Sequence, residues 1–185
     1  MRKTIFRLPC LCLIVLAAAL TFAADQIPTA TPMTNDIAGR SGTIALPSVF
    51  RIVCPSRNKG GTAFIHKSGL AITAAHVVAG CAPSEILLVP ISGEPIHVTN
   101  MVSDADLDIA LLYLAKSIPG PFLPIATENN LTIGAQVSTW GFPMGYNGSA
   151  PLLASGYISG VDNVKTESDK LVTRLVVNAA FNLGN

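Results

Sequence analysis

The sequence carries little charge, and the charge that it has is balanced. Only 12% of its 185 residues are charged, and 12 Lys and Arg against 11 Asp and Glu leave a formal net charge of +1. So small a net charge produces no overall field that would attract nucleic acid or an anionic membrane. We therefore expect no nucleic-acid partner, and local motifs must indicate the function.

Cysteine is also scarce, with four residues in the whole chain. Cys10 and Cys12 lie in an N-terminal apolar run, which leaves Cys54 and Cys81 for the rest of the protein. Two cysteines without a cluster of histidines argue against a structural zinc site, and neither lies in a recognisable nucleophile motif. In an oxidising compartment such a pair tends to form a disulfide, so the first expectation is one Cys54–Cys81 bridge.

The N-terminal apolar run falls short of a membrane span. Basic residues precede the run, which extends from Leu8 to Leu20, and small residues up to Ala24 follow it. This order is typical of a signal peptide cleaved after Ala23 or Ala24, whereas an uncleaved anchor needs about 20 apolar residues. The pattern predicts a signal peptide over residues 1–24, a secreted or periplasmic protein, and no stable membrane insertion after cleavage.

The rest of the chain lacks sustained helical periodicity. Residues 25–46 are rich in Thr, Pro, Asn, Gly and Ser and predict a flexible leader. Short apolar and β-branched stretches separated by turn residues follow, and their spacing is typical of an all-β barrel or sandwich. Only residues 74–79 predict a brief helical turn. A Pro-rich linker, residues 119–128, divides the strands into two β units, residues 47–118 and 129–185.

Nine strands are expected in these units. They are Val49 to Cys54, Gly61 to Ile65, Leu70 to Thr73, Ile86 to Pro90, Ile96 to Val102, Ile109 to Leu114, Gln136 to Trp140, Leu152 to Ser159 and Leu171 to Asn178.

The candidate for a catalytic base is His76, at the end of a predicted strand. Taken alone, a histidine in such a place is more often structural. However, the sequence from Gly60 to Val78, which ends Thr-Ala-Ala-His-Val-Val, resembles the histidine segment of trypsin-like serine proteases, and most closely that of the HtrA-like branch. The resemblance implies two six-stranded β-barrels with the catalytic residues in the cleft between them, and it implies that His76 is the base.

A second block carries a candidate acid. Residues 103–112, Ser-Asp-Ala-Asp-Leu-Asp-Ile-Ala-Leu-Leu, are similar to the aspartate segment of the same family, in which the acid directly precedes an Ile-Ala-Leu-Leu strand. The resemblance selects Asp108 as the carboxylate that orients His76. Asp104 and Asp106 are interpreted as turn carboxylates. The two other histidines, at positions 66 and 97, are interpreted as ordinary surface or strand residues.

Two further blocks follow in the order that the family has them. Residues 138–145 look like its Gly-aromatic-Pro segment, and residues 154–160 are similar to the Ser-Gly-x-Ile-Ser strand after it. Each block alone is weak evidence for the family, but their occurrence in the family's order makes the resemblance stronger. The polar segment from Asp162 to Leu171 departs from the family pattern and predicts a solvated loop.

The last nine residues, Val-Asn-Ala-Ala-Phe-Asn-Leu-Gly-Asn, resemble the approach to the family's nucleophile, which continues Ser-Gly-Gly. The resemblance implies a catalytic serine directly after Asn185, an oxyanion-hole donor at Gly184, and a small apolar residue of the specificity pocket at Ala180. We expect the complete form to cleave polypeptide substrates after small or medium apolar residues. A chain without the serine is expected to be inactive, and its second barrel is incomplete. No metal or organic cofactor is implied.

Two other interpretations remain. A non-catalytic, protease-like module that binds peptides would carry the same motifs, whereas an unrelated secreted β-sandwich would have to show four family-like blocks in the right order by coincidence. The first stays open as the alternative, and the second is set aside.

Overall fold

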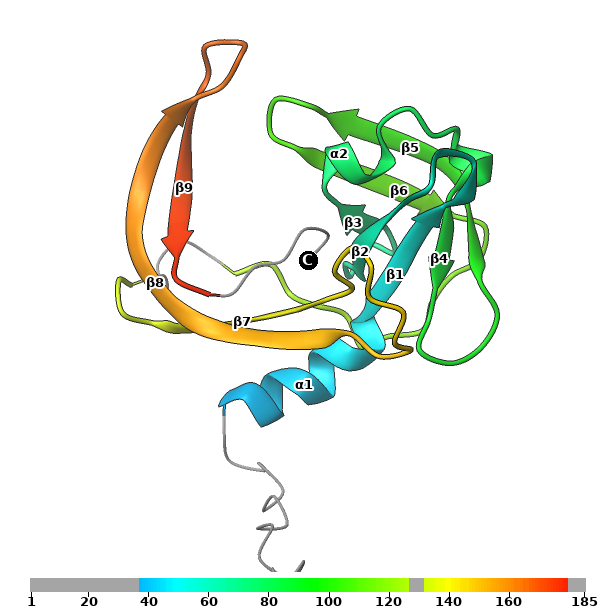
Figure 1. Ribbon diagram of the computed structural model, residues 1–185, viewed down its shortest axis with the longest axis horizontal. Helices are drawn as coiled ribbons and strands as arrows, with labels where there is room; N and C mark the ends of the chain where they lie inside the picture. Colours follow the sequence, from blue (N-terminus) through cyan, green and yellow to red (C-terminus); the bar gives the residue numbers. More distant parts are fainter. Residues whose placement is uncertain (1–36, 127–131, 180–185) are drawn as a thin grey trace, which may run out of the picture. The chain divides into compact units, whose positions relative to one another are not determined.

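The computed structural model describes residues 37–126 and 132–179 (Figure 1). The chain divides into two units, residues 1–31 and 32–185, and every described residue belongs to the second. The predicted signal peptide lies outside the described residues, as do Ala180, Gly184 and Asn185. No helix in the described ranges is long and apolar enough to cross a membrane.

The first six strands close into an antiparallel barrel in the order β1-β2-β3-β6-β5-β4. This confirms the six-stranded barrel that the family resemblance implied. They are β1 (Val49–Cys54), β2 (Lys59–Ile65), β3 (Ala71–Thr73), β4 (Leu87–Val89), β5 (Ile96–Asp104) and β6 (Ile109–Leu114). Three short helices connect them: η2 (Pro55–Arg57), α2 (Ala75–Val78) and η3 (Pro83–Glu85). Figure 1 shows α2 beside the barrel, next to β3 and β6.

The barrel interior is filled by side chains that alternate along the strands. Ile52, Ile65, Leu88, Val98 and Leu112 come from five different strands and are each at most 2% exposed. Their neighbours in sequence point outward because successive side chains of a strand face opposite sides. Burying one such side chain stabilises the fold by about 1.5 to 3 kcal/mol, so this core holds the strand ends in place.

A second sheet contains three strands in the order β7-β8-β9. They are β7 (Gln136–Gly141), β8 (Leu152–Lys165) and β9 (Leu171–Val177). β8 is a long, curved strand, and its first half pairs with β7 while its second half pairs with β9 (Figure 1).

The solvated loop predicted from Asp162 to Leu171 is therefore wrong over much of its length. Asp162 pairs with Arg174 and Lys165 pairs with Leu171 in the β8–β9 ladder. The polar side chains fit a strand because most residues of this two-stranded ribbon are exposed. One polar pair also bonds across it, since the Thr173 hydroxyl donates to Asn163 Oδ1 at 2.9 Å. Only residues 166–170 form the turn.

The structure also differs from the flexible leader predicted up to residue 46. The helix α1 (Ile37–Ser48) occupies part of this segment. Its residue Ala45 is buried in a small apolar cluster with Val49 and Phe142. Gly42 lies so close to the ring of Trp140 that a Cβ atom at this position would be 3.2 Å away. Gly, Ser and Pro predicted a linker here, but small residues are also what allows a helix to approach an aromatic ring closely.

Cys54 and Cys81 form a disulfide with a Cα–Cα distance of 6.5 Å. Both residues are buried, at 1% and 5% exposure. Cys54 ends β1 and Cys81 follows α2 by three residues, so the bridge attaches the segment of α2 to the barrel.

Replacing Cys54 and Cys81 together with alanine is expected to lower the free energy of unfolding by roughly 3 to 4 kcal/mol. The bridge joins residues 27 apart in sequence and restricts the unfolded chain accordingly. Urea denaturation of the oxidised protein and of the double variant measures the difference, and the reduced wild type is the matched control. Equal unfolding free energies for the oxidised protein and the variant would contradict this estimate.

Candidate active site

His76 is placed by the end of β3 and by the buried face of α2. Ala75, Val77 and Val78 of this short helix are buried in the barrel core, which leaves the side chain of His76 68% exposed. At the end of β3, the hydroxyl of Thr73 donates to a β2 carbonyl at 2.7 Å and fixes the start of the helix. The imidazole thus stands at the surface on a rigidly held backbone.

Asp108 reaches His76 because β3 and β6 are paired. The register sets Thr73 opposite Ala110, so the chain just after β3 lies against the chain just before β6. The N–H of Ala75 continues this pairing and donates to the carbonyl of Asp108 at 3.1 Å. Residues 32 apart in sequence are thereby brought into contact by barrel closure.

The carboxylate of Asp108 binds His76 twice. Oδ1 accepts from the backbone N–H of His76 at 2.9 Å, and Oδ2 lies 2.7 Å from the ring Nδ1. Asp108 adopts φ 54, a left-handed conformation that is uncommon outside glycine and for which Asp is enriched. Such a backbone costs about 1 to 3 kcal/mol and persists where its surroundings fix it, as the three bonds to residues 75 and 76 do here.

This arrangement selects one tautomer of the imidazole. A carboxylate at Nδ1 favours a proton on that nitrogen and leaves Nε2 as the acceptor. Partial burial acts to raise the pKa of Asp108, but the hydrogen bonds from the His76 backbone and ring, together with that of Ala75, hold this pKa below its ordinary value. The carboxylate is therefore ionised at neutral pH, and the pair has the geometry of a general base with its orienting acid.

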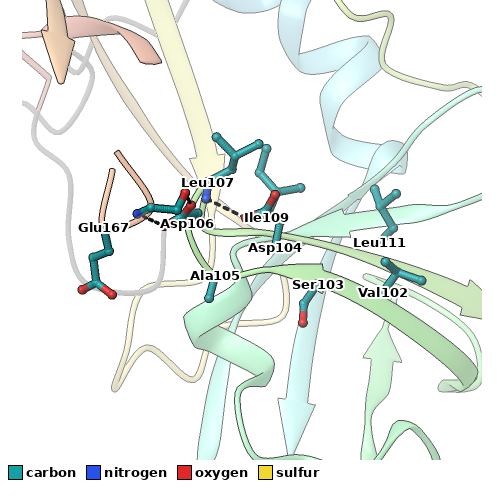
Figure 2. Close-up of a pocket in the computed structure, with 10 residues that line it drawn as sticks. Val102, Ser103, Asp104, Ala105, Asp106, Leu107, Ile109, Leu111 and Glu167 are labelled. Atoms are coloured by element: carbon teal, nitrogen blue, oxygen red, sulfur yellow. Dashed lines mark hydrogen bonds between the residues drawn. The ribbon is translucent and has the colours of Figure 1, made fainter. Parts of the chain in front are cut away.

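Asp104 and Asp106 lie in the same turn and differ from each other. Asp104 Oδ1 accepts from the N–H of Leu107 at 3.1 Å, which is the contact expected of a turn carboxylate. The side chain of Asp106 is only 16% exposed and bonds to the β8–β9 turn of the second sheet. Figure 2 shows Asp106 and Glu167, from the two turns, among the residues that line an open pocket. This pocket has a volume of about 770 Å³, and neither His76 nor Asp108 lines it.

Asp106 accepts hydrogen bonds from two residues of the β8–β9 turn and forms an ion pair with a third. It accepts from the N–H of Ser168 and from the hydroxyl of Thr166, both at 3.3 Å, and from the hydroxyl of Ser168. The Lys170 ammonium lies 4.0 Å away. The interpretation of Asp106 as a simple turn carboxylate missed this link because its partners lie about 60 residues away in sequence.

Lys59 is a second residue whose position sequence reasoning did not predict. It is the first residue of β2, and its ammonium donates to the carbonyls of His76 at 3.0 Å and Ala79 at 2.8 Å. These are carbonyl groups at the end of α2, where a helix has no partners of its own for them. Lys59 therefore helps to hold the helix that carries His76.

The remaining candidates are not brought to this pair. His66 lies 3.0 Å from the Ser68 hydroxyl in the turn after β2, and His97 is exposed on β5. Ala180 and Gly184 lie outside the described residues. Within residues 37–126 and 132–179, no group of three or more His, Cys, Asp or Glu side chains is arranged to hold a metal ion.

We expect the side chain of Asp108 to titrate with a midpoint below pH 3.8, which is the ordinary pKa of an aspartate. Because the folded-state pKa is lowered, the pair's stabilisation is complete above the ordinary value and is lost as the pH falls through the lowered value. The carboxyl ¹³C chemical shift of Asp108 measures the midpoint, and His76→Ala, which removes the ring but keeps the backbone N–H, is expected to move it upward. A wild-type midpoint at or above 3.8 would contradict the bonding described.

Asp106→Ala is expected to lower the free energy of unfolding by about 1 to 2 kcal/mol, because the N–H and hydroxyl groups of the β8–β9 turn lose their acceptor. Urea denaturation of this variant, of Ser168→Ala and of the double variant measures the coupling. The two losses should not add, since the residues share one contact. Asp162→Ala, which removes an exposed carboxylate from β8, is the control, and full additivity would argue against the link.

Comparison with known proteins gives the family. The sequence matches the trypsin-like peptidase domain over residues 61–185. A search of curated protein sequences finds no significant match.

Solved structures agree with the family match. The Rv3671c protease of M. tuberculosis in its inactive form has a TM-score of 0.63 at 28% identity, covering 85% of this chain and 78% of that one. Its active form has the same TM-score at 25% identity, covering 82% and 66%. The HtrA-type protease AlgW, solved with a decapeptide, has a TM-score of 0.63 at 19% identity, and this chain spans 52% of its length. The family match extends over more than half of the sequence, and the chain belongs to the trypsin-like peptidase domain family.

Proposed function

We propose that the complete protein is a serine endopeptidase in which His76 is the general base and Asp108 orients it. The observation that carries this proposal is the pair of hydrogen bonds between the Asp108 carboxylate and His76, 2.9 Å from Oδ1 to the backbone N and 2.7 Å from Oδ2 to Nδ1. Membership of a peptidase family supports the same reaction class. The nucleophile is the serine that the sequence pattern predicts directly after Asn185.

In the proposed reaction, Nε2 of His76 accepts the proton of the serine hydroxyl while its oxygen attacks the carbonyl carbon of the substrate. The imidazolium then gives that proton to the leaving amine, and the peptide C–N bond breaks. Asp108 stabilises the imidazolium because its carboxylate remains ionised, as its lowered pKa requires. Water hydrolyses the acyl-enzyme by the same proton transfers in reverse order.

The oxyanion hole and the specificity pocket rest on sequence alone. The N–H of Gly184 is proposed to bind the oxyanion, a donor worth roughly 2.7 to 4 kcal/mol in such enzymes. Ala180 is proposed to lie at the floor of the specificity pocket. A small apolar residue there offers no counter-charge to Arg or Lys, which supports cleavage after small or medium apolar residues.

We further propose that the protein is secreted or periplasmic. The basic, apolar and small-residue order of residues 1–24 supports export by a signal peptide. The disulfide between Cys54 and Cys81 supports an oxidising compartment.

Labelling with a fluorophosphonate tests the nucleophile and the base together. The chain extended through the expected serine should be labelled, and the 185-residue chain should not. His76→Ala should abolish labelling and lower kcat by about 10⁶-fold, and Asp108→Ala by about 10⁴-fold, by comparison with other serine proteases. His97→Ala, an exposed histidine on β5, is the matched control and should behave as wild type.

Labelling that survives His76→Ala, or an extended wild type that is never labelled, would overturn the proposal. In the second case a non-catalytic, peptide-binding module would be the better description.

A further inference from the structure

A cavity of about 420 Å³ has in its lining Lys59, whose ammonium donates to the carbonyl of His76. Its walls come from β1 and β2 around their connecting turn and from residues 142–147, which follow β7. Two cationic side chains, Arg51 and Lys59, line this basic cavity, and no Asp or Glu does. Val53, Phe142 and Met144 give it partly apolar walls.

Arg51 is held in the basic cavity by neutral groups. Its Cζ atom lies 4.9 Å from the ring centroid of Phe142 and 6.0 Å from that of Tyr146, and Nη2 donates to the carbonyl of Gly148. Contacts of this kind orient a guanidinium without cancelling its charge. Because a guanidinium has five N–H donors, several remain for a further acceptor.

Lys59 is held in the same way. Its ammonium donates to the carbonyls of His76 and Ala79, and one of its three N–H donors remains. The ion pairs among the described residues join His76 to Asp108, Lys165 to Asp169 and Lys170 to Asp106, so neither Arg51 nor Lys59 has a carboxylate partner there. The lining of the basic cavity thus includes two cationic residues, and no described carboxylate neutralises their charges.

We propose that the basic cavity binds a carboxylate side chain of the polypeptide substrate and so favours cleavage near a Glu or Asp. Hydrogen bonds from a guanidinium or an ammonium to a carboxylate are stronger than hydrogen bonds between neutral groups. The apolar walls suit the methylene groups of an acidic side chain. Lys59 bonds the backbone of His76 itself, so a side chain in this cavity belongs to a residue close to the reacting bond. The inference rests on the proposed peptidase function.

Binding of matched peptides tests the cavity without requiring catalysis. The probes are ten-residue peptides that are identical except for a single Glu or Gln, which is moved one position at a time. We expect one or two neighbouring positions at which the Glu peptide binds the 185-residue chain about ten-fold more tightly than its Gln partner. Its amide shifts should centre on Lys59, Gly60 and Gly61, and raising the salt concentration should reduce the difference.

Charge-removing variants identify the residues responsible. Lys59→Gln keeps N–H donors for the carbonyls of α2 and removes the charge, and Arg51→Gln removes the second charge. Both should bring the Glu-to-Gln affinity ratio toward one, while Arg174→Gln on β9, outside the cavity, should leave it unchanged. Equal affinity for Glu and Gln peptides at every position, or a preference that survives both substitutions together, would overturn the inference.

In the serine-containing chain, the same preference should appear as about a ten-fold higher kcat/KM for the Glu peptide. A chain that cleaves no peptide but still binds the Glu series preferentially would contradict the proposed peptidase function and support the basic cavity. A chain that cleaves Glu and Gln peptides equally would contradict the cavity and support the peptidase.

Discussion

The bond between the Asp108 carboxylate and His76 is the interaction on which the site depends. Oδ1 fixes the backbone of His76 and Oδ2 fixes its ring, so a single side chain determines where the imidazole stands and which nitrogen carries the proton. Asp108 itself has a left-handed backbone that is held by its neighbours. The geometry of the base is therefore a property of the whole junction between β3 and β6.

Barrel closure creates that junction. The pairing of Thr73 with Ala110 places the ends of two strands side by side, and the buried face of α2 leaves His76 as the residue that projects outward. Three further contacts hold this junction. The disulfide anchors the chain after α2, and Lys59 donates to carbonyls at the end of α2. Asp106 links the turn between β5 and β6 to the β8–β9 turn.

Much of the barrel was predictable because its signals are local. Alternating apolar residues bounded by turns identify β1 and β6 within a residue, and the motifs around His76 and Asp108 select the two side chains that the structure brings together. Long-range contacts carry no such local signal. Helix α1 and the partners of Asp106 depend on segments far apart in sequence, so composition alone predicted a leader and a turn in their place. The extension of β8 to Lys165 is a local hairpin with β9, and its polar composition predicted a loop instead.

The central claim is that this His–Asp pair serves a serine nucleophile. Sequencing the gene beyond the Asn185 codon tests it most directly, because the resemblance of the last nine residues to the family's nucleophile segment places the serine at one position. The account predicts in-frame codons for Ser-Gly-Gly. A stop codon, or a residue other than serine at that position, would contradict it.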